Sequence, residues 1–237
     1  MDFSQIRESL IKETKKKIKN SVTEDILIVQ AVAHLDDLTR IINILMKDLR
    51  EWYGYYNPEF SKEIQDHETF VNLLLEGKDK RIKDGMGGDL KKEDLVPIHV
   101  LAKKIIELFK FKEVQEKYLE SAMEEFCPNI TKVASYSIGA RLIKHAGSLR
   151  RLAMMPSSTV QLLGAEEALF RHIKTGAKSP KYGVLHSHNL VMKAKRNDAG
   201  RVARILANKI SIASRVDYMK GKFVGDKLLK DVEEKMR

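Results

Sequence analysis

Cations at loop and helical spacing give this sequence its clearest chemistry. A glycine-broken loop within 174–183 carries three lysines, and a helix expected from Asp198 carries arginines on one face. Exposed ammonium and guanidinium groups neutralise phosphates and release their counterions, and such contacts position a nucleic acid without reading its bases. An ordinary solvated surface is the alternative. The cations concerned are Lys174, Lys178, Lys181, Lys193, Lys195, Arg196, Arg201, Arg204 and Arg215.

No set of residues predicts catalysis. His186 and His188 are one residue apart with no third ligand near in sequence, so a structural or RNA-contacting role is favoured over a metal site. Cys127 precedes a proline and has no basic partner in sequence, which argues against a reactive thiol. Neighbouring acids such as Asp36 and Asp37 project apart on a helix, and no glycine fingerprint for a nucleotide or methyl donor is present. We therefore predict no enzymatic activity, no metal and no cofactor.

The positive charge is confined to one half of the chain. The sequence has 237 residues and a formal net charge of +10. Residues 1–120 hold 21 Lys+Arg against 23 Asp+Glu, whereas residues 121–237 hold 22 against 10. A nucleic-acid footprint therefore belongs to the C-terminal half, and a protein-protein role belongs to the N-terminal half.

The chain has one cysteine and no long apolar run. A single thiol cannot form an internal disulfide, which fits a reducing cytosol. The N-terminal residues lack the apolar core of a secretory signal, and no run approaches the roughly 20 apolar residues that cross a bilayer. We expect a soluble, cytoplasmic protein with no membrane partner.

The elements that must position these groups are predicted to be helices. Residues 1–21 form a lysine-rich, helix-compatible lead of the kind that is usually a solvated helix or a linker. Its lysines are Lys12, Lys15, Lys16, Lys17 and Lys19.

A long helix is predicted from Ser21 to about Tyr53. Apolar residues recur at alternating spacings of four and three, the heptad pattern of a coiled coil, with one polar interruption at Thr39. A second stripe runs beside the first, and two adjacent stripes predict burial on more than one side, as in a bundle. The second stripe comprises Leu27, Ala31, Leu38, Ile41, Leu45 and Trp52.

Two long helices are predicted to form an antiparallel hairpin. Glycine and proline within 54–58 end the first, a shorter helix over 59–75 and a glycine turn at 84–89 follow, and a second long helix runs from Asp94 to Phe126. Their doubled apolar faces invite a second copy of the chain. The residues predicted to make this association are Ile28, Val32, Leu35, Ile42, Met46, Leu49, Ile98, Leu101, Ile105 and Leu108.

Shorter helices are predicted after a break at 127–129. They cover 130–145, 149–155 and 166–173, and residues 182–192 alone have strand-like character. A last long helix starts at Asp198, and a terminal helix covers 226–236. The long helix is expected to bury Val202, Ile205, Leu206, Ile212 and Val216, and to expose Arg201, Arg204, Asn208, Ser211 and Arg215.

An ordered run of short motifs spans residues 137–217. It comprises Ser137-Ile138-Gly139-Ala140-Arg141-Leu142-Ile143, Ala146-Gly147-Ser148-Leu149, Met155-Pro156-Ser157-Ser158-Thr159-Val160-Gln161, Leu163-Gly164-Ala165-Glu166, Ala168-Leu169-Phe170-Arg171 and Ala213-Ser214-Arg215-Val216-Asp217. This run resembles the Nop domain of the box C/D ribonucleoprotein scaffold proteins, which include an archaeal Nop protein and eukaryotic nucleolar and spliceosomal relatives. The resemblance covers residues 22–237.

The resemblance implies particular partners. The family binds box C/D guide RNA at a kink-turn already folded by a small ribosomal-like kink-turn-binding protein, and pairs its coiled coil with a second Nop-family coiled coil. It holds the methyltransferase fibrillarin through a separate N-terminal domain. No such domain precedes Met1, so we expect a shortened chain without the fibrillarin contact, in the cytosol of an archaeon or, for eukaryotic relatives, in the nucleolus.

The resemblance also adds residues to the predicted RNA contact. They are Gly164, Ala165, Glu166 and Arg171. The family's Gly-Ala-Glu-Lys signature ends here in Glu167, which replaces a cation with an anion.

The resulting prediction is an all-α, non-catalytic scaffold with a long antiparallel coiled-coil hairpin followed by a compact helical Nop domain. Residues 1–21 are the basic lead, 22–126 the association domain, and 127–237 the part that binds RNA and the kink-turn protein. Relatives of full length bring fibrillarin to the RNA for guided 2′-O-methylation. The alternative is a basic coiled-coil adaptor whose positive half meets an acidic protein.

Overall fold

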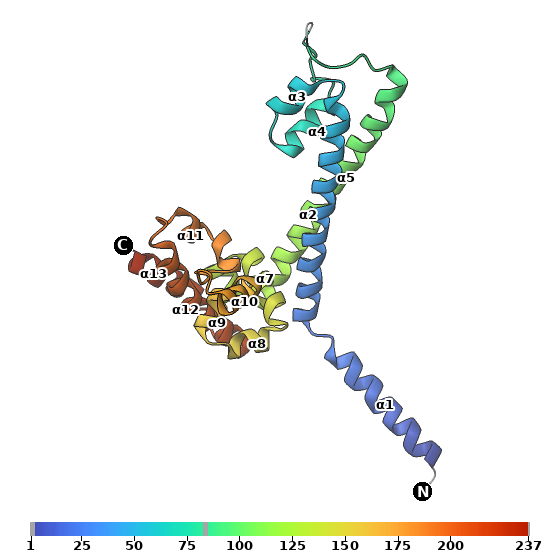
Figure 1. Ribbon diagram of the computed structural model, residues 1–237. Helices are drawn as coiled ribbons and strands as arrows, with labels where there is room; N and C mark the ends of the chain where they lie inside the picture. The colour runs from blue at the N-terminus through green and yellow to red at the C-terminus, as the bar shows by residue number, and fades with distance from the viewer. Residues whose placement is uncertain (1–2, 83–84, 237) are drawn as a thin grey trace. The chain divides into compact units, whose positions relative to one another are not determined.

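The computed structural model describes residues 3–82 and 85–236, and all regular secondary structure in that part of the chain is helical (Figure 1). The predicted all-helical class is therefore confirmed. The strand-like character predicted for residues 182–192 is wrong, because the stretch forms the 3-10 turn η1 (Val184–Ser187) and the short helix α11 (Asn189–Lys193). The His188 side chain starts α11 by accepting a hydrogen bond from the Leu190 amide at 3.2 Å.

Local caps fix the breaks between the N-terminal helices. Asn57 accepts a hydrogen bond from the Phe60 amide at 3.2 Å, and Asp66 accepts one from the Thr69 amide at 2.8 Å, so each following helix begins at a side-chain cap. These elements are α1 (Phe3–Ser21), α2 (Glu24–Gly54), α3 (Pro58–Glu63), α4 (His67–Leu75) and α5 (Lys92–Phe126). None of the helices in the described ranges combines the length and apolar content that a membrane crossing requires.

The chain divides into two compact units. The hairpin unit is His34–Tyr118. The terminal unit contains the described residues up to Ala33 and those from Leu119 onward. Helices α2 and α5 pack together and contribute residues to both units. The predicted hairpin of two long helices is thereby confirmed.

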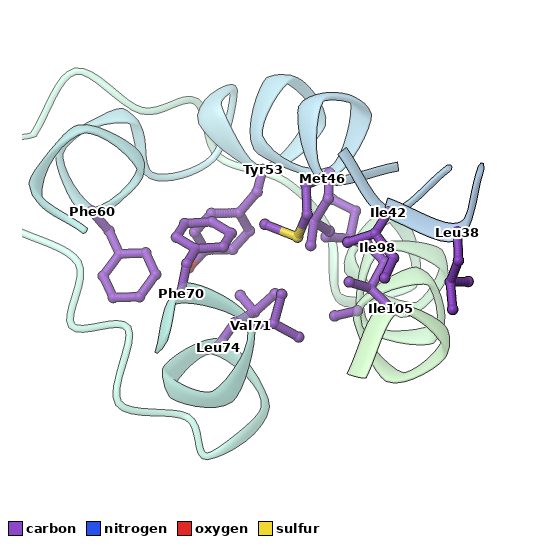
Figure 2. Close-up of a cluster of buried hydrophobic side chains, with 12 residues drawn as sticks. Leu38, Ile42, Met46, Tyr53, Phe60, Phe70, Val71, Leu74, Ile98 and Ile105 are labelled. Atoms are coloured by element: carbon purple, nitrogen blue, oxygen red, sulfur yellow. The ribbon is translucent and has the colours of Figure 1, made fainter. Parts of the chain in front are cut away.

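The hairpin unit buries an aromatic core between the ends of its long helices and the short helices α3 and α4 (Figure 2). Tyr53 lies at the centre, with its ring 5.9 Å from both Phe60 and Phe70, and the Phe60 and Phe70 rings are 5.1 Å apart. The Tyr53 hydroxyl donates to Asp79, and burial together with this carboxylate raises the pKa of Tyr53. Edge-on aromatic packing of this kind adds to the free energy gained from burial alone.

Arg50 holds the turn between α3 and α4. Its Nη1 donates to the carbonyls of Ser61 (2.9 Å) and Ile64 (2.8 Å), and its Nη2 donates to that of Gln65 (3.0 Å). Its guanidinium also lies 4.4 Å from the centre of the Phe70 ring. A single planar cation therefore satisfies the carbonyls left open at the end of α3 and ties them to the aromatic core.

The heptad residues predicted for association lie inside the chain. Eight of the ten are buried in the isolated chain, and the other two, Leu101 and Leu108, are half-buried. They form the internal seam of the hairpin, which a second copy cannot reach without opening it. The eight buried side chains are thus covered within a single chain, and their role in association stays a prediction. The eight buried residues are Ile28, Val32, Leu35, Ile42, Met46, Leu49, Ile98 and Ile105.

Helix α12 is the central element of the terminal unit and packs against α6, α8, α9 and α13. Its buried face is rich in alanine, including Ala203, Ala207 and Ala213, so neighbouring helices approach closely. The elements of this unit after Phe126 are α6 (Pro128–Ala134), α7 (Tyr136–Ala146), α8 (Leu149–Met154), α9 (Ser157–Leu162), α10 (Glu166–Thr175), η1, α11, α12 (Ala199–Tyr218) and α13 (Gly225–Met236).

A buried carboxylate joins three of these helices. Asp217, near the end of α12, accepts hydrogen bonds from the Asn129 side-chain amide (2.7 Å), the Asn129 backbone amide (3.2 Å) and the Ile130 amide (2.9 Å) at the start of α6. Asn129 in turn accepts from the Val224 amide at 2.7 Å, just before α13. Burial raises the pKa of Asp217 against the effect of these three donors. The Asp217–Asn129 pair thus satisfies amide groups at the start of α6 and just before α13.

Candidate nucleic-acid interface

Two backbone hydrogen bonds hold together the ends of the segment that contains α10 and the basic loop. The Gly183 amide donates to the Gln161 carbonyl at 3.1 Å, and the Val184 amide donates to the Leu163 carbonyl at 2.8 Å. These two bonds bring the ends of the intervening segment together, so α10 and the lysine loop after it are held at both ends. A Cβ on Gly183 would lie 1.8 Å from the Leu163 carbonyl oxygen, and only glycine allows this approach.

Glu166 closes the turn that leads into α10. Its Oε1 accepts a hydrogen bond from the Gly164 amide at 2.8 Å and lies 3.6 Å from His145 Nδ1. Gly164 has φ +82°, a left-handed conformation that glycine adopts without strain. Burial opposes the ionisation of Glu166, but the Gly164 amide, its own amide and His145 outweigh it and lower the pKa of this carboxyl. The turn is therefore fixed in conformation and carries a negative charge. It contains the predicted contact residues Gly164, Ala165 and Glu166.

Helix α10 presents its side chains to solvent. None of its residues is buried, and its cations Arg171 and Lys174 are exposed. The helix ends at Gly176 in the left-handed conformation (φ +69°), and Lys178 in the following loop is also exposed. Helix α10 and the loop after it therefore carry cations that have no ion-pair partner among the described residues.

Apolar side chains on the same helix are exposed as well. Phe170 is 64% exposed and Ile173 is 70% exposed, and Leu169 is half-buried. Neither Leu169 nor Phe170 is therefore a buried core residue. An amphipathic helix with an uncovered apolar side offers a contact surface for a further molecule.

Further cations gather at the start of α12. Arg201 and Arg204 lie one turn apart on its exposed face, and Arg196 is exposed just before it. The Lys181 side chain passes close to Gly200, where an added Cβ would meet its Cδ at 3.4 Å. The loop after α10 therefore brings Lys181 beside the first turn of α12, the turn that carries Arg201.

Arg215 differs from the other predicted cations. Its Nε donates to the Ala153 carbonyl at 3.2 Å, at the end of α8, so part of this guanidinium has a structural task. The predicted division of α12 also needs correction at two positions. Ser211 is buried and directed toward the Met155 carbonyl, whereas Ile212 is 37% exposed. These two residues lie at the border of the helix faces, where helical spacing alone does not decide burial.

The histidines and the cysteine have separate surroundings. His188 accepts from the Leu190 amide through Nδ1 and meets the Val133 carbonyl through Nε2 at 3.2 Å, whereas the His186 ring stacks on Tyr182 at 5.0 Å. Burial lowers the pKa of His188, although the Val133 carbonyl opposes this. The two imidazoles thus face different partners. Burial, then Asp217, raises the pKa of the Cys127 thiol. In the described ranges, no group of three His, Cys, Asp or Glu residues is placed to hold a metal ion.

Comparison with known proteins places this geometry in a family. The family model described as "Nop: snoRNA binding domain, fibrillarin" matches residues 34–85 and 77–237. An uncharacterized NOP5 family protein of Methanocaldococcus jannaschii is 38% identical over 246 residues, which cover 94% of this chain and 59% of that protein. Human nucleolar protein 56 is 36% identical over 253 residues, covering 94% and 43%.

Two further comparisons agree with these. Nucleolar protein 58 of Schizosaccharomyces pombe is 39% identical over 232 residues, covering 88% of this chain and 46% of that protein. The solved structure of a fibrillarin/Nop5p complex shares the fold with a TM-score of 0.61 at 22% identity, covering 98% of this chain and 77% of that one. The chain spans about half the length of these curated relatives.

Proposed function

This chain belongs to the Nop family of snoRNA-binding-domain proteins, and we propose on that premise that it is a non-catalytic scaffold of a box C/D ribonucleoprotein. In this proposal, residues 127–237 bind a box C/D guide RNA that a small kink-turn-binding protein has already folded. The observation that carries the proposal is the series of exposed cations on α10, in the loop after it and at the start of α12, where the Lys181 side chain lies beside Gly200.

These cations suit a backbone contact. Phosphates are satisfied by ammonium and guanidinium groups that need no fixed partner within the protein. The backbone hydrogen bonds of Gly183 and Val184 fix the position from which α10 projects. A fixed position allows the protein to select RNA by its bent shape, without a motif that reads bases. The RNA-binding residues of the proposal are Gly164, Ala165, Glu166, Arg171, Lys174, Lys178, Lys181, Arg196, Arg201, Arg204 and, in part, Arg215.

The uncovered apolar residues of α10 support a composite partner. Phe170 and Ile173 stand on the same short helix as Arg171 and Lys174. A phosphate backbone alone leaves such apolar groups in water, whereas a protein bound to the RNA, or the exposed base at an RNA end, would cover them. This supports recognition of RNA together with the kink-turn protein.

The test is a gel shift with kink-turn RNA, with and without the kink-turn protein. We expect strong binding only when both are present, and a double substitution Arg201→Ala and Arg204→Ala to weaken it and flatten its salt dependence. The matched control removes two exposed lysines of α13 instead, Lys227→Ala and Lys230→Ala. Equal, weak binding with and without the kink-turn protein would favour the basic adaptor.

A second function, self-association, is favoured by an exposed apolar face on the hairpin unit. His34 of α2 contacts Phe111 of α5 with ring centres 5.7 Å apart, so these two positions lie on one side of the helix pair. Ile41 follows His34 by one heptad, and Val114 and Tyr118 follow Phe111 by three and seven residues, which keeps them on that side. The exposed residues of this face are Ile41, Trp52, Val96, Val100, Phe111, Val114 and Tyr118.

This face is a better association surface than the buried seam. Its residues are between 43% and 60% exposed, and a cluster of large apolar side chains on a surface marks a contact site. We propose that a second Nop-family coiled coil, a second copy of this chain in the simplest case, covers it. The four helices would then share one core.

The mass in solution tests this. Ile41→Glu with Val114→Glu should convert a dimer to a monomer, because two charges would be buried without partners. Tyr55→Glu with Ile82→Glu adds the same charge at exposed apolar residues outside the face and should leave the mass unchanged. A monomeric wild-type chain at all concentrations would remove the proposal.

A further inference from the structure

Four lysines share one face of α1. Lys12, Lys15, Lys16 and Lys19 follow the spacing i, i+3, i+4 and i+7, so at 100° per residue they fall within one narrow stripe of the helix. The stripe extends roughly 10 Å along the axis, since each residue rises about 1.5 Å. Regular cations over this length match a charged polymer better than a single small anion.

Within the described ranges, no ion pair involves the four lysines of this stripe. All described residues of α1 are exposed, and the helix buries none of them. Its one ion pair among the described residues joins Lys17 to Glu13 at 2.7 Å, and Lys17 lies on a different face from the stripe. The four ammonium groups are therefore available to a partner.

The opposite face of α1 argues against a lipid surface. The exposed apolar residues on that side are interrupted by Lys17, which follows Leu10 by seven residues and is paired with Glu13. The apolar residues are Phe3, Ile6, Leu10, Ile11 and Ile18. A helix that lies in a membrane interface needs a continuous apolar face. Inserting α1 would bury this ion pair with the apolar residues, at a cost in desolvation.

We propose that the four-lysine stripe of α1 binds the phosphate backbone of RNA and forms a second RNA contact, separate from the cations of α10 and α12. The inference rests on the proposed function, because the RNA is the one already held by residues 127–237. The near-neutral charge of residues 1–120 conceals this site, since α1 has six cations and two acids while the rest of that half is acidic. The contact would neutralise phosphates without base recognition.

The salt dependence of RNA binding by the whole chain tests the contact. Changing Lys12, Lys15, Lys16 and Lys19 together to Gln should weaken binding about 100-fold near 0.1 M salt and reduce the slope of log K against log salt by about 3, because each lost phosphate contact removes about 0.7 to 0.9. Glutamine keeps the helix intact, so circular dichroism should not change.

A matched control removes the same charge elsewhere. Lys80, Lys91, Lys92 and Lys103 are exposed in the hairpin unit and have no ion pair in the described structure, and their change to Gln should leave the slope near that of the wild-type chain. Equal losses in both variants would reduce the effect to net charge and overturn the inference. So would an unchanged slope in the α1 variant. A wild-type chain that binds no RNA would instead defeat the proposed function, which keeps the two failures distinct.

Cross-linking identifies the bound molecule. Cys127 is buried, so Lys16→Cys introduces the reactive thiol to which a photo-cross-linker can be attached. In the complex of the chain with kink-turn RNA and the kink-turn protein, this label should cross-link to RNA. The same label at Leu10→Cys, on the opposite face of α1, should cross-link much less. Cross-links from position 16 to protein alone, or binding of the stripe to anionic phosphatidylserine vesicles with RNA affinity unaffected by the lysine changes, would overturn it.

Discussion

The hairpin unit and the terminal unit are both built from helices, yet they differ in the residues that mark their surfaces. The hairpin unit closes an aromatic core and still exposes large apolar side chains along α2 and α5. The terminal unit packs its apolar core around α12 and exposes cations on α10 and α12, together with the apolar side chains of Phe170 and Ile173. The first surface gains free energy by meeting another apolar surface, and the second by releasing counterions.

The interiors differ as well. The hairpin unit relies on aromatic rings packed edge-on beside Arg50, whereas the terminal unit relies on the carboxylate of Asp217 and the amide of Asn129. Ring packing is lost gradually when volume is removed, but a buried polar pair fails as a unit when one partner is missing. Substitutions in the two interiors therefore separate these two modes of stabilisation.

Phe70→Ala should have the largest effect. The side chain is fully buried, contacts Tyr53 and Phe60, and lies under the Arg50 guanidinium. Truncating a buried phenylalanine costs about 3 to 5 kcal/mol. Denaturant unfolding measures the loss, and hydrogen exchange should show it concentrated in α3 and α4.

Tyr55→Ala is the matched control, because this ring is two residues from Tyr53 in sequence but 73% exposed. It should change the free energy of unfolding by less than about 0.5 kcal/mol. If Phe70→Ala also speeds exchange throughout α6 and α12, the two units unfold together and their interiors do not stabilise them separately.

Asp217→Ala should come next, at about 3 kcal/mol. It leaves the Asn129 side-chain amide and the Ile130 amide buried without an acceptor, and each unsatisfied group costs about 1 to 3 kcal/mol. Faster exchange should appear in α6, α12 and α13 and not in α3 or α4. Asp226→Ala, which removes an exposed ion pair with Lys132 at 3.0 Å, should cost below about 1 kcal/mol.

Sequence pattern predicted the long helices because apolar periodicity over thirty residues leaves few alternatives. The same pattern did not tell the internal seam from an association surface, since Ile42 and Ile41 are equally apolar and adjacent. Only the position of α5 decides that Ile42 is 2% exposed and Ile41 47%. On a helix with two apolar stripes, the stripe that becomes buried is the one against which another helix packs. The local sequence does not determine which stripe that is.

The candidate site shows the same limit. The exposed cations of the loop and of α12 were predictable, because lysine and arginine rarely lie buried without partners. Arg215 was not, since its bond to the Ala153 carbonyl joins positions 62 residues apart. The hydrogen bonds of Arg50 at the end of α3 could not be predicted either, because the sequence around a single arginine on a helix does not indicate which carbonyls it will bind.

Acidic pH should lower the free energy of unfolding of both units, by less than the Phe70→Ala or Asp217→Ala substitution does. Burial and the neighbouring Arg50 lower the pKa of His67, which accepts a hydrogen bond from Arg50 Nε at 3.2 Å, and burial lowers the pKa of His188. Since the unfolded chain takes up these protons first, stability is full above about pH 6.5 and falls as the pH drops through each folded-state pKa.

Thermal unfolding between pH 7.5 and 5 measures this dependence. His67→Gln should flatten the part that belongs to the hairpin unit and leave the part from His188 in the terminal unit. A melting temperature that rises as the pH falls through 6.5 would contradict the assignment of both histidines as neutral in the fold.

Glu167→Lys should have the smallest effect and bears on the charge of the terminal unit alone. Glu167 is exposed in the first turn of α10, where an acid favours the helix dipole by about 0.3 to 1 kcal/mol, so the lysine should cost a few tenths in stability. It adds a cation beside the turn held by Glu166, and one further phosphate contact should tighten RNA binding about threefold to fivefold and steepen the salt slope by about 0.7 to 0.9. Glu167→Gln separates the removal of repulsion from a new contact, because it should tighten binding while leaving the slope nearly unchanged. If neither variant alters RNA affinity while Arg201→Ala with Arg204→Ala does, the RNA path runs along α12 and leaves the start of α10 free for the protein partner.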